Sequence, residues 1–160
     1  MDNRVAPPAE KELKDALDRW STGSDADPPI FETKQQLLMF AAGVGRYLGQ
    51  QEPDGKRDSG AAIRFDIFEK NLDDTYLFAL ASEATGGLTV LRESRGDEVV
   101  AIFESFARAG LREMVARVDK HGGDPLSIFL DLALEAAGDA DESDIPEGLE
   151  PSVFRKLVKE

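Results

Sequence analysis

Apolar residues recur at intervals of three and four along most of the chain, which is the spacing of one face of an α-helix. Residues 8–20 show this spacing, and Pro8 suits a first-turn position. A second apolar face follows Thr33, which forms a capping-box pattern with Gln36. Its members are Leu37, Phe40, Ala41, Val44 and Leu48. These patterns predict two helices in the N-terminal third.

The second half of the chain carries three more helical patterns. One begins at Asp73 or Asp74 and stops at Gly86; another begins at Asp97 and stops at Gly122. The longest apolar face belongs to the latter, with Val99, Ile102, Phe103, Phe106, Ala107, Gly110, Leu111, Met114, Val115 and Val118. The last runs from Asp124 and Pro125 to Gly138.

Shorter segments complete the prediction. Residues 61–70 are extended or a short helix, and residues 88–91 suit a short strand. Four-residue spacing predicts that Glu104 pairs with Arg108 and that Glu113 pairs with Arg117.

The predicted fold is therefore mainly α, a compact bundle of five or six helices with at most one short strand pair. Three parts are expected: an N-terminal helix and linker over 1–29, a helical core domain over 30–138, and an acidic linker with a short C-terminal helix over 139–160.

The stretch FAAGVGRYLG, residues 40–49, contains three glycines inside a predicted helix. Dinucleotide-binding glycines stand at a strand-to-helix turn with the spacing GxGxxG, and neither condition holds. Ala41, Gly45 and Gly49 lie four apart instead, so we expect a small-residue face that packs closely against the Val99–Val118 helix. Gly49 has a second interpretation as the helix stop. A Gly45→Leu variant should then lose stability.

The amino-acid composition of the chain excludes several classes of function. The chain has 160 residues, no cysteine and a net charge of −13. Absence of cysteine excludes disulfides and thiolate metal sites. No signal peptide and no membrane-length apolar run is present, which predicts a cytoplasmic protein without membrane association. The acidity has three interpretations: solubility, docking of a basic partner, or mimicry of nucleic acid.

Candidate chemistry is sparse. The single histidine, His121, stands at a predicted helix end, where it suits the helix dipole. We interpret Asp73 and Asp74 as a cap at the start of a helix, in preference to an acid–base pair. The acids of the C-terminal linker lack the central glycine of a calcium loop and are interpreted as a solvated surface for a basic partner; they are Asp139, Asp141, Glu142 and Asp144. No catalytic residue, cofactor or metal is expected.

Four basic residues gather in one region of the sequence: Arg46, Lys56, Arg57 and Arg64. They are candidates for contact with nucleic acid or with a partner protein. Acidic neighbours, Glu52, Asp54 and Asp58, reduce the local net charge, so direct DNA binding is the weaker of the two interpretations.

The segment FETKQQLLMFAAGVGRYLGQQEP, followed by IRFDIFEKN, resembles the DNA phosphorothioation-associated protein 4 family, which is associated with Dnd systems. The resemblance spans about residues 30–135 and rests on Phe31, Thr33, Leu38, Phe40, Ala41, Ala42, Gly49, Pro53, residues 63–68, Phe103, Phe106, Gly110 and Leu111. Dnd systems replace a non-bridging phosphate oxygen of DNA with sulfur, and companion proteins restrict unmarked DNA. The resemblance implies an accessory role in this modification or restriction, and hence in antiviral defence, with no catalytic residue to assign.

Four hypotheses follow. The first is a non-enzymatic accessory protein that binds larger Dnd proteins by helix-face docking, steered by its acidic charge. The second is a nucleic-acid-binding module that uses the four basic residues, and the third is an acidic DNA mimic. The fourth is an enzyme that relies on carboxylates alone.

Overall fold

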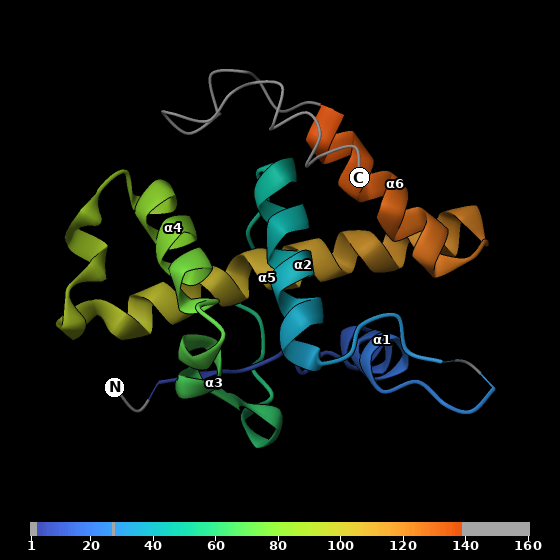
Figure 1. Ribbon diagram of the computed structural model, residues 1–160, viewed down its shortest axis with the longest axis horizontal. Helices are drawn as coiled ribbons and strands as arrows, with labels where there is room; N and C mark the ends of the chain where they lie inside the picture. The colour runs from blue at the N-terminus through green and yellow to red at the C-terminus, as the bar shows by residue number, and fades with distance from the viewer. Residues whose placement is uncertain (1–2, 27, 139–160) are drawn as a thin grey trace.

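The computed structural model describes residues 3–26 and 28–138. Within them lie six α-helices and one two-stranded antiparallel sheet, which confirms a mainly α fold (Figure 1). The helices are α1 (Lys11–Ser21), α2 (Lys34–Leu48), α3 (Phe65–Lys70), α4 (Asp74–Thr85), α5 (Gly96–His121) and α6 (Pro125–Gly138). The strands are β1 (Arg4–Val5) and β2 (Ile63–Arg64), and short 3-10 turns are η1 (Ser59–Ala61), η2 (Leu88–Leu91) and η3 (Glu93–Arg95).

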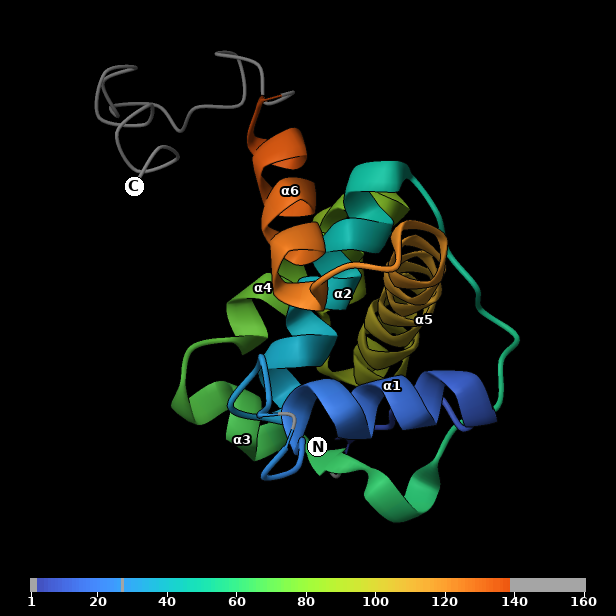
Figure 2. The same ribbon diagram turned by 90° about the vertical axis from the view of Figure 1, so that its right-hand side faces the viewer.

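Helix α5 is the longest element, and the other helices are arranged around it (Figures 1 and 2). Its 26 residues span about 39 Å at 1.5 Å per residue. Helix α2 crosses it near the middle, with α4 to one side and α1 and α6 to the other. None of the described helices is long and apolar enough to cross a bilayer.

One hydrophobic core joins the N-terminal elements to the rest. Leu13, Leu17 and Trp20 of α1 are buried in the same cluster as Leu37 of α2 and Phe103 of α5. Strand β1 adds to this connection, because Arg4 and Val5 pair with Arg64 and Ile63. The hydrophobic core therefore continues across residue 30.

The helix ends follow the signals in the sequence. The Thr33 hydroxyl accepts a hydrogen bond from the Gln36 N–H at 3.1 Å, and the Gln36 side chain accepts one from the Glu32 N–H. Gly86 and Gly122 end α4 and α5 with φ of 73° and 58°, in the left-handed region that favours glycine. At the start of α6, the Asp124 carboxylate accepts from the Leu126 N–H at 3.3 Å.

Several local expectations were wrong. Pro8 does not open α1; it forms an isolated bridge with Arg57, and the helix begins at Lys11. Residues 88–91 form a 3-10 turn instead of a strand. Residues 61–70 contain both alternatives, since β2 leads directly into α3.

Two side-chain expectations also need correction. Asp73 stands at the N-cap position of α4, but its carboxylate makes no capping bond and accepts from Gln35 Nε2 of α2 at 2.6 Å. The Asp74 carboxylate accepts a hydrogen bond from the Thr75 N–H at 2.9 Å. Glu104 does not pair with Arg108, because it binds Arg57 from the loop before η1. The predicted pair of Glu113 and Arg117 is present at 2.9 Å.

Candidate functional site

The crossing of α2 and α5 brings two backbones into direct contact. A Cβ added at Gly110 would overlap the carbonyl group of Ala41 and lie 2.8 Å from the Gly45 nitrogen. A Cβ added at Gly45 would overlap the carbonyl oxygen of Phe106. Gly49 takes no part in this contact: it ends α2 with φ of 65°, and open space surrounds it. The crossing is packed too closely to leave room for a ligand.

A buried carboxylate on α5 holds the N-terminal strand. Glu104 is 8% exposed and accepts a hydrogen bond from the Ala6 N–H at 2.7 Å. It also accepts two from the Arg57 guanidinium, at 2.7 and 2.8 Å. The hydrogen bond to Glu104 raises the pKa of Arg57. Glu104 thus fastens β1 and the loop before η1 to the same helix.

One turn later, Arg108 holds the loop that leaves α2. Its guanidinium is 3% exposed and donates to the carbonyl oxygens of Glu52 at 3.0 Å and Lys56 at 2.7 Å. Glu10 lies 3.3 Å from the Nε atom. Gly55 is required here, because an added Cβ would lie 2.5 Å from the Arg108 Nη1 atom.

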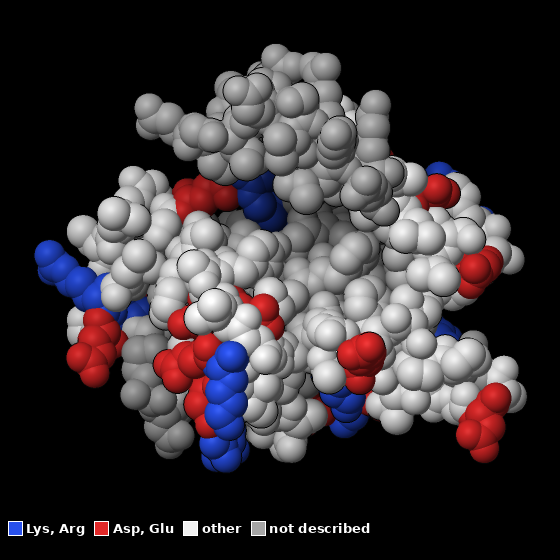
Figure 3. Space-filling model, viewed as in Figure 1, with Lys and Arg blue, Asp and Glu red and all other residues white. Residues whose placement is uncertain are grey.

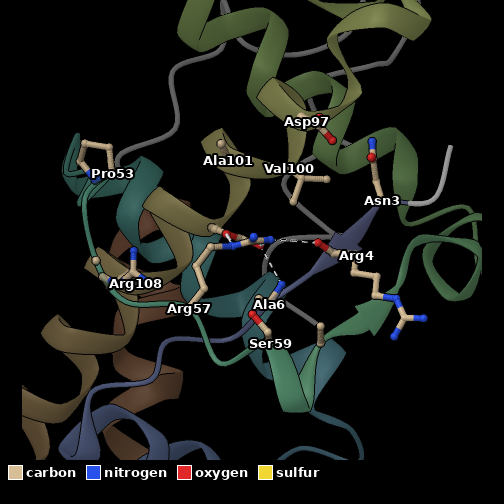
Figure 4. Close-up of a pocket in the computed structure, with 13 residues that line it drawn as sticks. Asn3, Arg4, Ala6, Pro53, Arg57, Ser59, Asp97, Val100, Ala101 and Arg108 are labelled. Atoms are coloured by element: carbon tan, nitrogen blue, oxygen red, sulfur yellow. Dashed lines mark hydrogen bonds and ion pairs between the residues drawn. The ribbon is translucent and has the colours of Figure 1, made fainter.

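The two charged groups border a polar pocket of about 640 Å³ beside β1 (Figure 4). Arg57 extends across it, and Asp97 and Asn3 line its far side. Both members of the Glu104–Arg57 ion pair therefore hold parts of this chain together. The arrangement is that of a structural network that closes a loop and a strand onto α5.

The four basic residues predicted as a contact surface are not brought together. Arg46 lies at the end of α2 and pairs with Glu83 of α4, with Nε 2.6 Å from the carboxylate. Arg64 lies in β2, and Lys56 and Arg57 lie in the loop between α2 and η1. Arg64 donates to Asp66 at 3.0 Å, so all three arginines bind a carboxylate. The acidic residues Asp139, Asp141, Glu142 and Asp144 lie outside the described residues.

Helix α6 presents an apolar face without a partner in the described chain. Leu126, Leu130 and Leu134 are 46%, 55% and 61% exposed, and their four-residue spacing places them on one side of the helix. The opposite side holds α6 to the core through Phe129 and Leu132, which are buried. We call the three leucines the α6 leucine face.

An apolar groove adjoins this face, between α2, α4 and α6. It encloses about 300 Å³ and is lined by Met39, Phe40, Gly43, Val44, Tyr47, Tyr76, Leu132, Ala133 and Ala136. The surface of the molecule is hollowed here in Figure 3. Gly43 keeps the groove open, because a Cβ there would lie 3.0 Å from the Tyr76 hydroxyl. Burial raises the pKa of that hydroxyl.

Sequence reasoning missed both apolar features. The signal was present, because α6 has apolar residues on nearly all sides and two acids, Asp131 and Glu135, as its only charges. A helix of that composition is either buried all round or covered by something else. His121 stands at the end of α5, and within residues 3–26 and 28–138 no group of three His, Asp or Glu could hold a metal ion.

The described chain is thus a small mainly α protein whose buried charges fasten its own loops and whose unpartnered apolar surface lies on α6. The family model for DNA sulphur modification system-associated protein 4 matches residues 4–147, and the chain belongs to that family. The resemblance noted in the sequence is confirmed, and the match extends beyond residues 30–135 at both ends. The protein is therefore associated with a DNA sulphur modification (Dnd) system. Searches of curated proteins and of solved structures give no match.

Proposed function

We propose that the protein is a non-enzymatic accessory component of a Dnd modification or restriction system, and that it acts by binding a larger protein of that system through the α6 leucine face. The observation that carries the proposal is the exposure of Leu126, Leu130 and Leu134 on one side of a helix. Clustered exposed apolar side chains of this kind are typical of interaction sites. The family supplies the kind of partner, a component of the same system.

The charges of α6 specify the partner further. The helix carries Asp131 and Glu135 and no Lys or Arg. Both acids lie to the same side of the leucine face, at increments of 100° per residue. Glu135 already binds Arg117 of α5, with Nη1 2.9 Å from the carboxylate, so Asp131 is the acid of α6 that we expect a partner to meet. A partner surface that has an apolar strip with basic residues along one edge would complement the α6 leucine face. The net charge of −13 on this protein would attract such a basic partner.

A second copy of the chain fits this surface less well. If two α6 helices packed antiparallel about a two-fold axis, the same side of each helix would meet its copy. Asp131 would then face Asp131 across the contact, without a base on either helix to offset the repulsion. The acidic edge favours a different protein.

The non-enzymatic part of the proposal is supported by what the buried ionisable groups do. Glu104 and Arg108 are the buried charged residues among those described, and both bind other parts of the same chain. In this role the protein tunes the assembly or the DNA engagement of modification or restriction proteins in the cytoplasm, as part of antiviral defence.

Direct DNA binding is the weaker alternative. Arg46, Arg57 and Arg64 each hold a carboxylate, so contact with phosphate would first require these ion pairs to break. If Arg57→Ala together with Arg64→Ala removed a salt-dependent DNA complex, this alternative would gain support. Competition between the protein and duplex DNA for one partner would instead indicate a DNA mimic.

The test is direct binding between purified proteins. The protein is mixed with each larger protein of its DNA sulphur modification system, and affinity is measured for wild type and for the triple variant Leu126→Ser, Leu130→Ser, Leu134→Ser. We expect one partner to bind and the triple variant to lose at least about tenfold in affinity, which is 1.4 kcal/mol. Leu88→Ser is the matched control, since Leu88 is 73% exposed but lies on η2. Equal affinity of the wild type, the triple variant and the Leu88→Ser control would refute the proposal. Failure to bind any of the system's proteins would also refute it.

A further inference from the structure

The apolar groove between α2, α4 and α6 adjoins the α6 leucine face but is lined by different residues. We propose that residues 153–158 of this chain, sequence VFRKLV, bind in that groove. The segment lies outside the described residues, so the inference rests on the groove, on the point where the described chain ends, and on the sequence that follows. It goes beyond the proposed function, because it needs no partner protein.

The position of the groove relative to the end of α6 supports this occupant. Ala133 and Ala136 line the groove, and α6 ends at Gly138. Gly138 is two residues beyond Ala136, which is about 3 Å along a helix axis. The chain therefore leaves the described region directly beside the groove.

The linker is long enough for the segment to return. Fourteen residues, 139–152, separate Gly138 from Val153. Fourteen residues reach at most about 50 Å when fully extended, which exceeds the roughly 21 Å length of α6. Because the segment belongs to the same chain, its binding is intramolecular and needs less affinity than binding by a separate molecule.

The composition of the segment complements the groove. Val153, Phe154, Leu157 and Val158 supply apolar side chains at helical spacing, and the groove is lined almost entirely by apolar atoms. A volume of about 300 Å³ accommodates one or two such side chains. Arg155 and Lys156 lie between them in sequence. The charged residues of α6 are Asp131 and Glu135, and Glu135 already binds Arg117, so Asp131 is the acid that these bases would meet.

The matched family region ends at residue 147, before this segment begins. The groove contact is therefore a feature of this chain in addition to the family region. Because the groove adjoins the α6 leucine face at Ala133, a segment held there lies at the border of the surface that we propose for the partner.

Cysteine pairs test the contact in the full chain, which has no cysteine of its own. Met39 lines the groove on α2, so Met39→Cys is combined with Phe154→Cys and the rate of disulfide formation is measured in dilute protein. The first control pair, Leu88→Cys with Phe154→Cys, places the partner thiol on η2, away from the groove. The second, Met39→Cys with Gly148→Cys, keeps the groove thiol and moves the other into the linker.

We expect the Met39 and Phe154 pair to form an intramolecular disulfide at least tenfold faster than either control pair. Adding Leu157→Ser to that pair should slow it severalfold, because an apolar contact is lost. Equal rates in all three pairs would overturn the proposal, and so would disulfide-linked dimers as the main product, which would make a second copy the occupant. The experiment contains no other protein, so its failure leaves the proposed docking through α6 untouched.

Discussion

The α2–α5 crossing and helix α6 use apolar residues in opposite ways. At the crossing, Gly45 and Gly110 remove side chains so that two backbones touch. Helix α6 has larger apolar side chains, yet only Phe129 and Leu132 are buried among its residues, while three leucines face water. Small residues therefore allow two helices to cross closely at the centre of the molecule, whereas three large residues of α6 are left exposed at its edge.

The comparison separates stability from binding. Substitutions at the crossing should change the free energy of unfolding, because the contacts there hold the fold together. Substitutions on the α6 leucine face should change affinity for a partner and leave the fold almost unaltered, because apolar surface already in water contributes nothing to folding. Five predictions test this separation, in order of decreasing effect.

The largest loss of stability is expected for Gly45→Leu. The new side chain would have to occupy the position of the Phe106 carbonyl group, and backbone atoms cannot move aside as a flexible side chain can. We expect a loss of roughly 4 kcal/mol or more in urea denaturation, or failure to fold. Gly123→Leu is the control, because no atom lies within 4 Å of its added Cβ. A wild-type midpoint for Gly45→Leu would show that the crossing is not tightly packed.

The next largest effect is expected where α6 meets the core. Phe129 is 3% exposed and packs edge-on against Trp20, with ring centroids 4.8 Å apart. Phe129→Ala should lower the free energy of unfolding by about 3 kcal/mol. Leu130→Ala, at the next position but on the exposed face, should change it little. Similar losses for both variants would mean that the two sides of α6 do not differ as described.

A smaller loss is expected in the polar network on α5. Glu104→Gln removes the charge that binds Arg57 and the Ala6 N–H, and should cost about 2 kcal/mol in denaturation experiments. The same substitution at Glu98 of α5, whose ion pair with Arg95 of η3 is more exposed, should have little effect. If the two variants were equally stable, the network would not be fastening β1 to α5.

The triple leucine variant should lose little stability. Leu126→Ser, Leu130→Ser and Leu134→Ser together should lower the free energy of unfolding by less than about 2 kcal/mol, because roughly half of each side chain is already exposed. Thermal melting monitored by circular dichroism measures this. A loss as large as that of Phe129→Ala would mean that the leucines hold the fold, and the docking interpretation would lose its basis.

The smallest effect concerns the ion pair between Lys14 of α1 and the partly buried Asp58 in the loop before η1. A hydrogen bond from Lys14 lowers the pKa of the Asp58 carboxyl. Its stabilising contribution is present above the ordinary carboxyl pKa, about 3.9, and is lost as the pH falls through the lowered value. In Lys14→Gln the pKa of Asp58 should rise toward the ordinary range in a carbon-13 NMR titration. Asp66, paired with Arg64, is the internal control. An unchanged Asp58 pKa would contradict this.

Local signals predicted the helices well because each signal acts within one or two turns. The bond from Thr33 to Gln36, and the left-handed glycines at 86 and 122, involve only neighbours in sequence. Contacts over long separations were predicted poorly. Arg57 lies 47 positions from Glu104, and it displaced Arg108, the expected local partner.

The α6 leucine face was missed for a related reason. Periodicity shows which residues share a side of a helix, and in α6 Phe129 and Leu130 give apolar candidates on different sides. The packing of Trp20, Phe31 and Phe40 against Phe129 decides which side is buried, and all three are far away in the sequence. The prediction for the basic residues was wrong in the opposite way. They are close in sequence, but Arg46 binds Glu83 of α4, whereas Arg57 binds Glu104 of α5 and Arg64 binds Asp66.

Amide hydrogen exchange tests the central claim most directly, by comparing the protein alone with its complex with a larger protein of the DNA sulphur modification system. The account predicts that new protection is concentrated in residues 125–138 of α6, while residues 4–8 and 56–65 around the strand pair exchange as in the free protein. New protection around the strand pair, with α6 unchanged, would contradict the claim that the α6 leucine face is where the partner binds.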